Sequence, residues 1–327
     1  MFNRIVAATD LVTISDAPVI SAARMARAHG ARLFLLHVME SASLENRRLV
    51  RHFMTDLEMT SDVGYENELR QVLETTYRDS LADLPHEVRI SAGFPWEEIL
   101  RLSRLVDTDL IVLGPHSTRA EEKGVIRTIG RVGSTVENVI TRETCPVMVV
   151  NRPADVDRLL FRRVLVAVDF SRSCESAIRF AVKLAASRHS RLIVFHMLPV
   201  PPFPKYTRSD YMADEARARQ RIESFYEDSL SGVDYRYLIR AGAMPHLEIL
   251  KAVEENRVDL IVMGSHTKER PGKWYPGSAV ERVCYRTAGP VIVITDPTAL
   301  KHWQGSERDA DRQDKDRLIH LFGGKYH

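Results

Sequence analysis

The sequence contains few cysteines, no long apolar run and almost no net charge. Its three cysteines, Cys145, Cys174 and Cys284, lie far apart without a CxxC spacing, so we expect buried thiols in a reducing compartment. No apolar run approaches the roughly 18–20 residues that span a bilayer. A strand is expected within four residues of the first methionine, which leaves no signal peptide. These absences predict a soluble, cytoplasmic protein that does not associate with membranes.

The charge balance and the missing motifs argue against several function classes. With 46 Lys and Arg against 44 Asp and Glu, the formal net charge is +2, and no basic run predicts a nucleic-acid partner. The 12 histidines show no HxxxH or His/Cys ligand spacing, so no metal site is expected. A GxSxG motif, a Walker lysine and a paired-carboxylate device are also missing. We therefore expect no catalytic residues.

What the sequence does contain is a long internal repeat. Residues 4–10 (RIVAATD) match 163–169 (RVLVAVD), and residues 109–116 (DLIVLGPH) match 259–266 (DLIVMGSH). The spacing from Asp10 to His37 and from Asp169 to His196 is 27 residues in both cases. A period of roughly 155 residues has the size of a domain. We expect two domains, residues 1–152 (half one) and 161–297 (half two), followed by a charged tail over 298–327.

Each half alternates strands and helices. Short apolar runs at 5–9 and 164–168 are typical of strands buried on both faces of a parallel sheet. A helix follows each run, and Ser173 is the expected N-cap of the second. Further strands are predicted at 32–38, 87–91, 110–113 and 147–150, and at 191–197, 235–239, 260–263 and 291–294. This alternation predicts two tandem, doubly wound, five-stranded parallel α/β sheets.

Ligands of such sheets bind beyond the carboxyl ends of the strands. The candidates there are Asp10 and Asp169 after the first strands, Val38 and Met197 at the ends of the second strands, and the Gly-x-His loops of Gly114/His116 and Gly264/His266. Gly133-Ser134 and Gly277-Ser278 each open a helix, where free amides suit a phosphate. Two alternatives remain open: the aspartates bind a ligand, or they bond to nearby loop amides. We interpret His37 and His196 as packed, hydrogen-bonded residues, and nothing beside Cys174 suggests an activated thiolate.

Taken together, these marks resemble the universal stress protein superfamily, and specifically its tandem-domain members. The resemblance rests on the strand-one Asp, the His after strand two, the Asp-Leu-Ile-Val-Met-Gly-Ser-His run and the late Gly-Ser pair, and it covers residues 2–152 and 161–296. It implies a Rossmann-like fold of the adenine nucleotide alpha hydrolase type with strand order 3-2-1-4-5. It also implies that ATP or AMP, with Mg²⁺ accompanying ATP, is held through a Gly-x2-Gly-x9-Gly-Ser/Thr loop.

Carried onto half two, the resemblance selects Asp169, Met197, Gly264, His266, Thr267, Gly277, Ser278 and Ala279. The nine-residue spacing before Gly277 is intact, but Thr267 replaces the second glycine, and a β-branched residue keeps a phosphate away from the backbone.

Half one offers Asp10, Val38, Gly114, His116, Gly133 and Ser134, with 15 residues instead of nine between Ser117 and Gly133. Pro115 also removes a loop amide. The inserted segment adds four charged residues, which either clamp an anion or solvate a longer loop. They are Arg119, Lys123, Arg127 and Arg131. Half two is therefore the better predicted nucleotide site.

The leading hypothesis is a cytoplasmic stress-response protein that binds an adenine nucleotide mainly in half two. It would act as a regulator with at most slow ATP hydrolysis. The alternative is a scaffold, or a carrier of another metabolite such as an acyl-bearing ligand. Single-domain relatives pair through their last strands, so we expect residues 147–150 and 291–294 to pair as an intrachain pseudo-dimer. We also expect the chain to form a homodimer.

Overall fold

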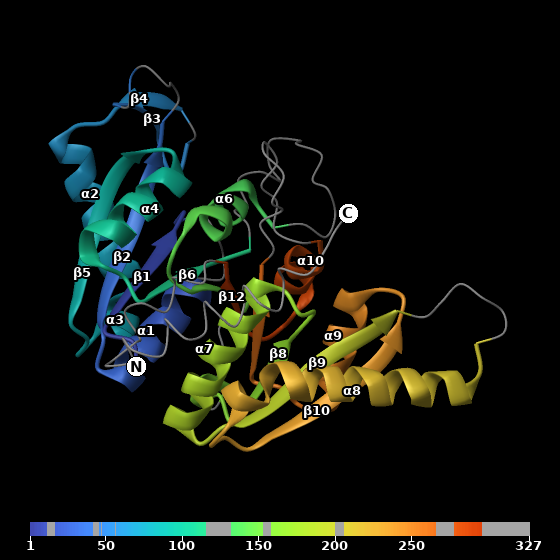
Figure 1. Cartoon of the computed structure of the whole chain (residues 1–327). Coiled ribbons are helices and arrows are strands. Elements are labelled where there is room, and N and C mark those ends of the chain that lie inside the picture. The colour runs from blue at the N-terminus through green and yellow to red at the C-terminus, as the bar shows by residue number, and fades with distance from the viewer. Residues whose placement is uncertain are drawn as a thin grey trace, which may run out of the picture.

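The two halves supply the same succession of strands and helices to one sheet (Figure 1). The computed structural model describes residues 1–11, 17–41, 46, 48–55, 57–115, 132–152, 158–199, 206–265 and 278–295. Half one contains β1 (Arg4–Thr9), α1 (Ala17–His29), β2 (Arg32–Glu40), β3 (Leu49–Arg51), β4 (Glu58–Thr60), α2 (Val63–Thr76), α3 (Arg78–Leu81), β5 (His86–Gly93), α4 (Pro95–Val106), β6 (Leu110–Leu113), α6 (Ser134–Arg142) and β7 (Val147–Val149). After the 3-10 turn η1 (Arg158–Leu160), half two contains β8 (Arg163–Ala167), α7 (Arg172–Arg188), β9 (Arg191–Pro199), α8 (Arg208–Leu230), β10 (Tyr235–Gly242), α9 (Pro245–Glu255), β11 (Leu260–Gly264), α10 (Ser278–Arg286) and β12 (Val291–Ile294).

The main sheet has ten strands in the order β10-β9-β8-β11-β12-β7-β6-β1-β2-β5. Within each half the pairing is parallel and follows the order third, second, first, fourth, fifth strand. The predicted α/β class with strand order 3-2-1-4-5 is therefore confirmed for both halves.

The halves join through their fifth strands, as predicted. β7 and β12 pair antiparallel, with the register Val147↔Val293, Met148↔Ile292 and Val149↔Val291. All of these side chains are buried. In an isolated half each fifth strand would be an exposed apolar edge, which promotes aggregation, and the antiparallel pairing covers both edges at once. The edges of the joined sheet are β5 and β10.

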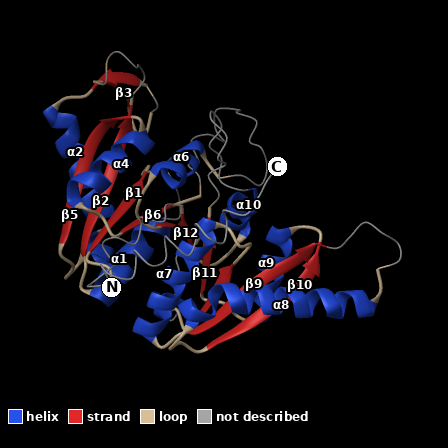
Figure 2. Ribbon diagram, viewed as in Figure 1, coloured by secondary structure: helices blue, strands red, loops and turns tan. Residues whose placement is uncertain are grey.

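Helices cover both faces of the sheet, and each face carries its own hydrophobic core (Figure 2). Ile5 and Ala7 of β1 belong to one core and Val6 to the other, because successive side chains of a strand point to opposite faces. Helices α1, α7 and α8 pack into the first core, and α4, α6, α9 and α10 into the second. Both cores contain side chains from both halves, so the halves share their apolar interior.

Two local expectations differ from the structure. The N-cap of α7 is Ser171, whose hydroxyl accepts a hydrogen bond from the Cys174 amide, and the helix therefore begins before the expected Ser173. The second difference is an antiparallel hairpin, β3–β4, inserted between β2 and α2 of half one. Half two has no strand between β9 and α8 in the part of the chain that the structure describes.

Polar contacts also cross the junction between the halves. The Asn151 side-chain amide donates to the carbonyls of Cys284 (2.7 Å) and Thr287 (2.6 Å), so the end of half one caps the last turn of α10. On the face of the sheet covered by α1 and α7, the Arg188 guanidinium lies 2.7 Å from Nε2 of His29. Burial, the Arg188 charge and the N-terminal ammonium lower the pKa of His29 to about 3. Protonation of His29 would therefore oppose the contact between α1 and α7.

Candidate ligand site at the carboxyl edge of the sheet

Asp169 stands at the carboxyl edge of half two, where β8 gives way to α7. Its Oδ1 accepts hydrogen bonds from the Ser171 amide (3.2 Å) and from the Cys174 thiol (3.0 Å), yet the residue remains exposed. The carboxylate thus organises the start of α7 and still faces solvent. Asp10 is partly buried at the equivalent point of half one. Both readings of the strand-one aspartates, loop organisation and ligand binding, are compatible with the position of Asp169.

His37 and His196 are hydrogen-bonded to backbone, as predicted, but β2 and β9 each continue three residues beyond them. Nδ1 of His37 lies 3.0 Å from the Thr9 carbonyl, and Nδ1 of His196 lies 2.9 Å from the Val168 carbonyl. Each imidazole thereby ties the second strand of its half to the end of the first strand. His37 is buried and His196 is partly buried.

Cys174 is a buried thiol beside the candidate pocket. Burial and the neighbouring Asp169 carboxylate raise its pKa to about 12, because both disfavour the thiolate. Burial likewise raises the pKa of Cys284 to about 12 and raises that of Cys145. The three cysteines are buried and free, and none has the lowered pKa that an activated nucleophile requires.

Gly264 has a packing reason to be glycine. A β-carbon at this position would lie 2.5 Å from the Ser173 carbonyl carbon and 2.6 Å from the Cys174 amide nitrogen. The end of β11 therefore runs directly against the backbone of the first turn of α7. This contact places the fourth strand of half two next to the loop that carries Asp169.

Two further predicted residues of half two, Met197 and Ala279, lie on the same side of the sheet. Met197 of β9 and Ala279 of α10 are both partly buried and pack against the same hydrophobic core. α10 begins at Ser278, as the Gly-Ser pair predicted. His266, Thr267 and Gly277 lie outside the described residues. The phosphate loop of half two therefore stays a prediction.

In half one, a backbone hydrogen bond closes the loop between the fourth strand and the last helix. The Gly133 amide donates to the Pro115 carbonyl at 2.7 Å, and Gly133 is the N-cap of α6, which begins at Ser134. This amide is thus engaged within the loop. Gly114 directly follows the last residue of β6, and Val38 packs against the core that also contains α4 and α6. His116 and the added segment with Arg119, Lys123, Arg127 and Arg131 lie outside the described residues.

Sequence reasoning missed a pair of tyrosines beneath the strand-one loops. Tyr77 and Tyr226 are almost fully buried, and each begins a Tyr-x-Asp-Ser-Leu run, the repeat that could have identified them. The Tyr77 hydroxyl lies 3.0 Å from Oγ1 of Thr9, while the ring of Tyr226 stacks on Phe170 with centroids 6.1 Å apart. The residue after each aspartate has a left-handed backbone conformation, with φ 60° at Leu11 and φ 66° at Phe170. Such strain persists where surrounding packing enforces it.

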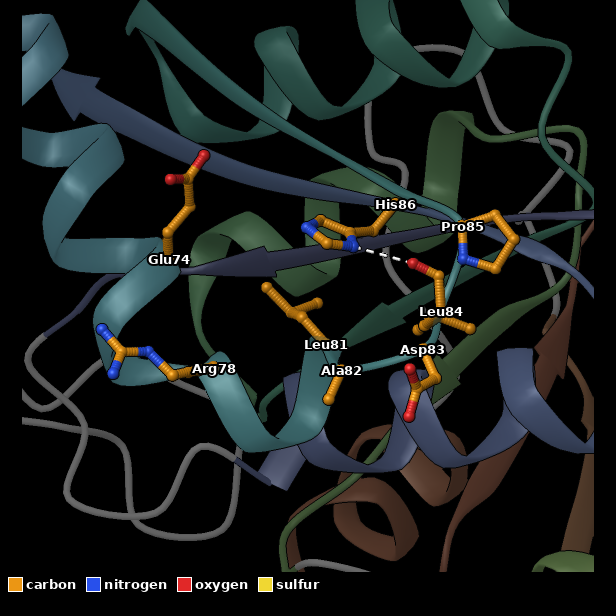
Figure 3. Close-up of a pocket in the computed structure, with 8 residues that line it drawn as sticks. All are labelled: Glu74, Arg78, Leu81, Ala82, Asp83, Leu84, Pro85 and His86. Atoms are coloured by element: carbon orange, nitrogen blue, oxygen red, sulfur yellow. Dashed lines mark hydrogen bonds between the residues drawn. The ribbon is translucent and has the colours of Figure 1, made fainter.

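A surface hollow lies at the opposite edge of the sheet (Figure 3). It has a volume of about 580 Å³ and is lined by Glu74, Arg78, Leu81, Ala82, Asp83, Leu84, Pro85 and His86. Because β5 starts at His86, the hollow is at the amino end of the strands, away from the aspartates. Nδ1 of His86 lies 2.8 Å from the Leu84 carbonyl.

In the part of the chain that the structure describes, no group of three or more His, Cys, Asp or Glu side chains is arranged to hold a metal ion. No helix in these described ranges is long and apolar enough to cross a membrane.

Curated relatives match the chain over about two fifths of its length. A universal stress protein of Methanocaldococcus jannaschii is 24% identical over 156 residues, which is 42% of this chain and 96% of the relative. One from Thermus aquaticus is 27% identical over 138 residues, 41% of this chain and 99% of the relative. These relatives therefore correspond in length to one half of the chain.

Solved structures resemble the whole chain. A universal stress protein from Archaeoglobus fulgidus has a TM-score of 0.58 at 22% identity, covering 90% of this chain and 96% of that one. A functionally unknown protein from Pseudomonas aeruginosa has a TM-score of 0.57 at 14% identity, covering 92% and 95%. At these identities the likeness concerns the fold.

The family comparison covers both halves. The model of the universal stress protein family matches residues 1–151 and again residues 160–295. With the repeat in the sequence and the repeated fold in one continuous sheet, the chain belongs to the universal stress protein family, in a tandem two-domain arrangement.

Proposed function

We propose that this tandem universal stress protein binds an adenine nucleotide, ATP or AMP, at the carboxyl edge of half two. The observation that carries the proposal is the exposed Asp169 carboxylate at the end of the first strand, on the edge where α10 begins. A carboxylate there can accept hydrogen bonds from ribose hydroxyls, Met197 offers an apolar contact for a base, and the first amides of α10 suit a phosphate. With ATP, Mg²⁺ would bind through the phosphates.

The proposed role is regulatory. Burial raises the pKa of the three cysteine thiols, and Nδ1 of His37 and of His196 contacts a backbone carbonyl; both observations support a binding role over nucleophilic catalysis. ATP turnover, if measurable, is slow. The protein would act in the cytoplasm through the conformation or partner choice of its nucleotide-bound form, and a homodimer of the whole chain is part of this proposal.

The test begins with mass spectrometry of the ligand released from the purified full chain. Calorimetric titration with ATP and AMP, with and without Mg²⁺, then compares the wild type with Asp169→Asn, which keeps the side-chain volume but removes the charge. Asp10→Asn in half one is the matched control. We expect Asp169→Asn to weaken binding and Asp10→Asn to leave it nearly unchanged. Loss of binding only in the Asp10 variant would contradict the assignment to half two.

A second candidate function is a scaffold or a carrier of another metabolite. Gly264 favours it, because the packing against α7 requires this glycine whether or not a phosphate binds nearby. Thr267 in place of a loop glycine points the same way. Release of a non-nucleotide compound, together with no binding heat from ATP or AMP, would support this candidate and reject the first.

A further inference from the structure

The outer face of α9 and α10 differs in charge from the equivalent face of half one. In half one, the guanidinium of Arg142 lies 4.8 Å from the centroid of the Trp96 ring and also donates to Oδ1 of Asn138. The cation is thus satisfied by an aromatic face and by an amide oxygen. Arg142 and Asn138 belong to α6 and Trp96 to α4, and the two helices pack together.

The repeat identifies the equivalent residues of half two. Counted from the proline that begins α4 or α9, Trp96 corresponds to His246. Counted from the serine that begins α6 or α10, Asn138 and Arg142 correspond to Arg282 and Arg286. The Trp96 ring and the Asn138 side chain, two of the groups that contact the half-one arginine, are therefore replaced by groups that donate hydrogen bonds or carry positive charge.

These replacements leave three donors together. α9 packs on α10, and Arg282 and Arg286 are four residues apart, so they lie on one side of the helix. Both arginines are exposed, whereas His246 is 4% exposed. Burial and the charges of Arg282 and Arg286 lower the pKa of His246. Within the described part of the chain, neither arginine forms an ion pair or hydrogen bond, and the His246 ring has no hydrogen-bond partner.

Half two has also lost acidic side chains around this face. Leu247 stands where half one has Glu97, and Thr287 where half one has Glu143. Glu143 accepts hydrogen bonds from the Thr144 and Cys145 amides, and Thr287 replaces this role with a neutral hydroxyl that accepts from the Gly289 amide. The loop is therefore still capped, but without a carboxylate at this position.

We propose that His246, Arg282 and Arg286 form a binding site for an oxyanion of the phosphate class. Guanidinium groups match the geometry of phosphate oxygens and hold them by charge-assisted hydrogen bonds, and the imidazole supplies a further donor from the buried side. The site differs from the nucleotide site proposed above, because it uses side chains of α9 and α10, whereas the nucleotide proposal uses strand-end residues and the first backbone amides of α10. Half one has no equivalent site, since Trp96 and Asn138 already satisfy Arg142.

The chain itself provides the test variant. The double substitution His246→Trp, Arg282→Asn gives half two the arrangement that folds in half one. Arg286→Asn is a second variant at an exposed position. Arg217→Asn on α8, which removes an equal charge from an exposed pair with Asp214, is the matched control. Titration of the full chain with inorganic phosphate at constant ionic strength measures the affinity of each.

We expect the wild type and Arg217→Asn to bind phosphate equally. The double variant and Arg286→Asn should bind it at least about tenfold more weakly, because each loses a charge-assisted hydrogen bond. A parallel titration with glycerol phosphate distinguishes two ligand classes. Tighter binding of glycerol phosphate indicates a phosphomonoester ligand, and tighter binding of inorganic phosphate indicates free phosphate. Equal phosphate affinity in the wild type and Arg286→Asn, or no binding by the wild type in the millimolar range, would overturn the proposal.

Discussion

Gly264 offers the sharpest test of how β11 and α7 are joined. Replacing it by alanine would bring a methyl group to 2.5 Å from the Ser173 carbonyl carbon and 2.6 Å from the Cys174 amide nitrogen. These are backbone atoms of the first helical turn, so the strand and the helix would have to separate. Overpacking of this kind costs about 2–3 kcal/mol. For domains of comparable size, each kcal/mol lowers the melting temperature by about 2–4 °C.

The assay is denaturant and thermal unfolding of the full chain without added ligand. Gly242→Ala at the end of β10 is the comparison, because its new methyl group would meet Cγ of the Glu248 side chain at a similarly short distance, and a side chain can change its rotamer whereas the backbone of α7 cannot. We expect Gly264→Ala to lower the free energy of unfolding by about 2–3 kcal/mol and Gly242→Ala by about 1 kcal/mol, the cost of a shifted rotamer. Equal stability of Gly264→Ala and the wild type would refute the packing argument.

Three further predictions concern other contacts. As the pH falls from about 6.5 towards 3, His29 becomes protonated in the unfolded chain but not in the folded chain. The free energy of unfolding should therefore fall over this window by about 1–2 kcal/mol, after allowance for the partial exposure of His29. In unfolding curves, His29→Gln should remove this pH dependence and Arg188→Gln should reduce it. Tyr77→Phe should lower the free energy of unfolding by about 1 kcal/mol, because it loses a hydrogen bond. Tyr226→Phe should be nearly neutral, because its hydroxyl has no hydrogen-bond partner among the described residues. Equal losses of stability in the two variants would contradict this difference between the tyrosines. Thr267→Gly should tighten ATP binding by about 1 kcal/mol in calorimetry if the half-two loop cradles phosphate, and an unchanged affinity would argue against that loop.

Several features of the fold could be predicted because they depend on local patterns. The continuous apolar runs at β1, β8, β6 and β11 indicate strands buried on both faces, and their alternation with helices indicates a parallel sheet. The strand-one aspartates were expected at the carboxyl edge because a parallel sheet brings all strand ends of one kind together. The Ser171 cap was missed, since several serines at the start of α7 fit the same pattern.

Features that depend on contacts between distant residues were not predictable in the same way. The tyrosines under the strand-one loops are an example. Tyr77 lies between α2 and α3 and Tyr226 lies within α8, and their apolar surroundings in the sequence indicate burial but not which loop the ring supports. Gly264 was expected to serve a phosphate, and the structure shows that the backbone of α7 occupies the space where its side chain would be.

The sequence by itself determined the duplication and the alternation of strands and helices, because repeat spacing and hydrophobic periodicity are properties of the chain read in order. The strand order of each half and the pairing of the fifth strands were implied by the resemblance to the universal stress protein superfamily. Only the tertiary structure decided the antiparallel register between β7 and β12, the two cores shared by both halves and the packing of α9, which carries His246, against α10, which carries Arg282 and Arg286. Those features depend on which side chains meet after packing. A repeated sequence predicts equivalent positions, but substitutions at a few of them give the two halves different surfaces.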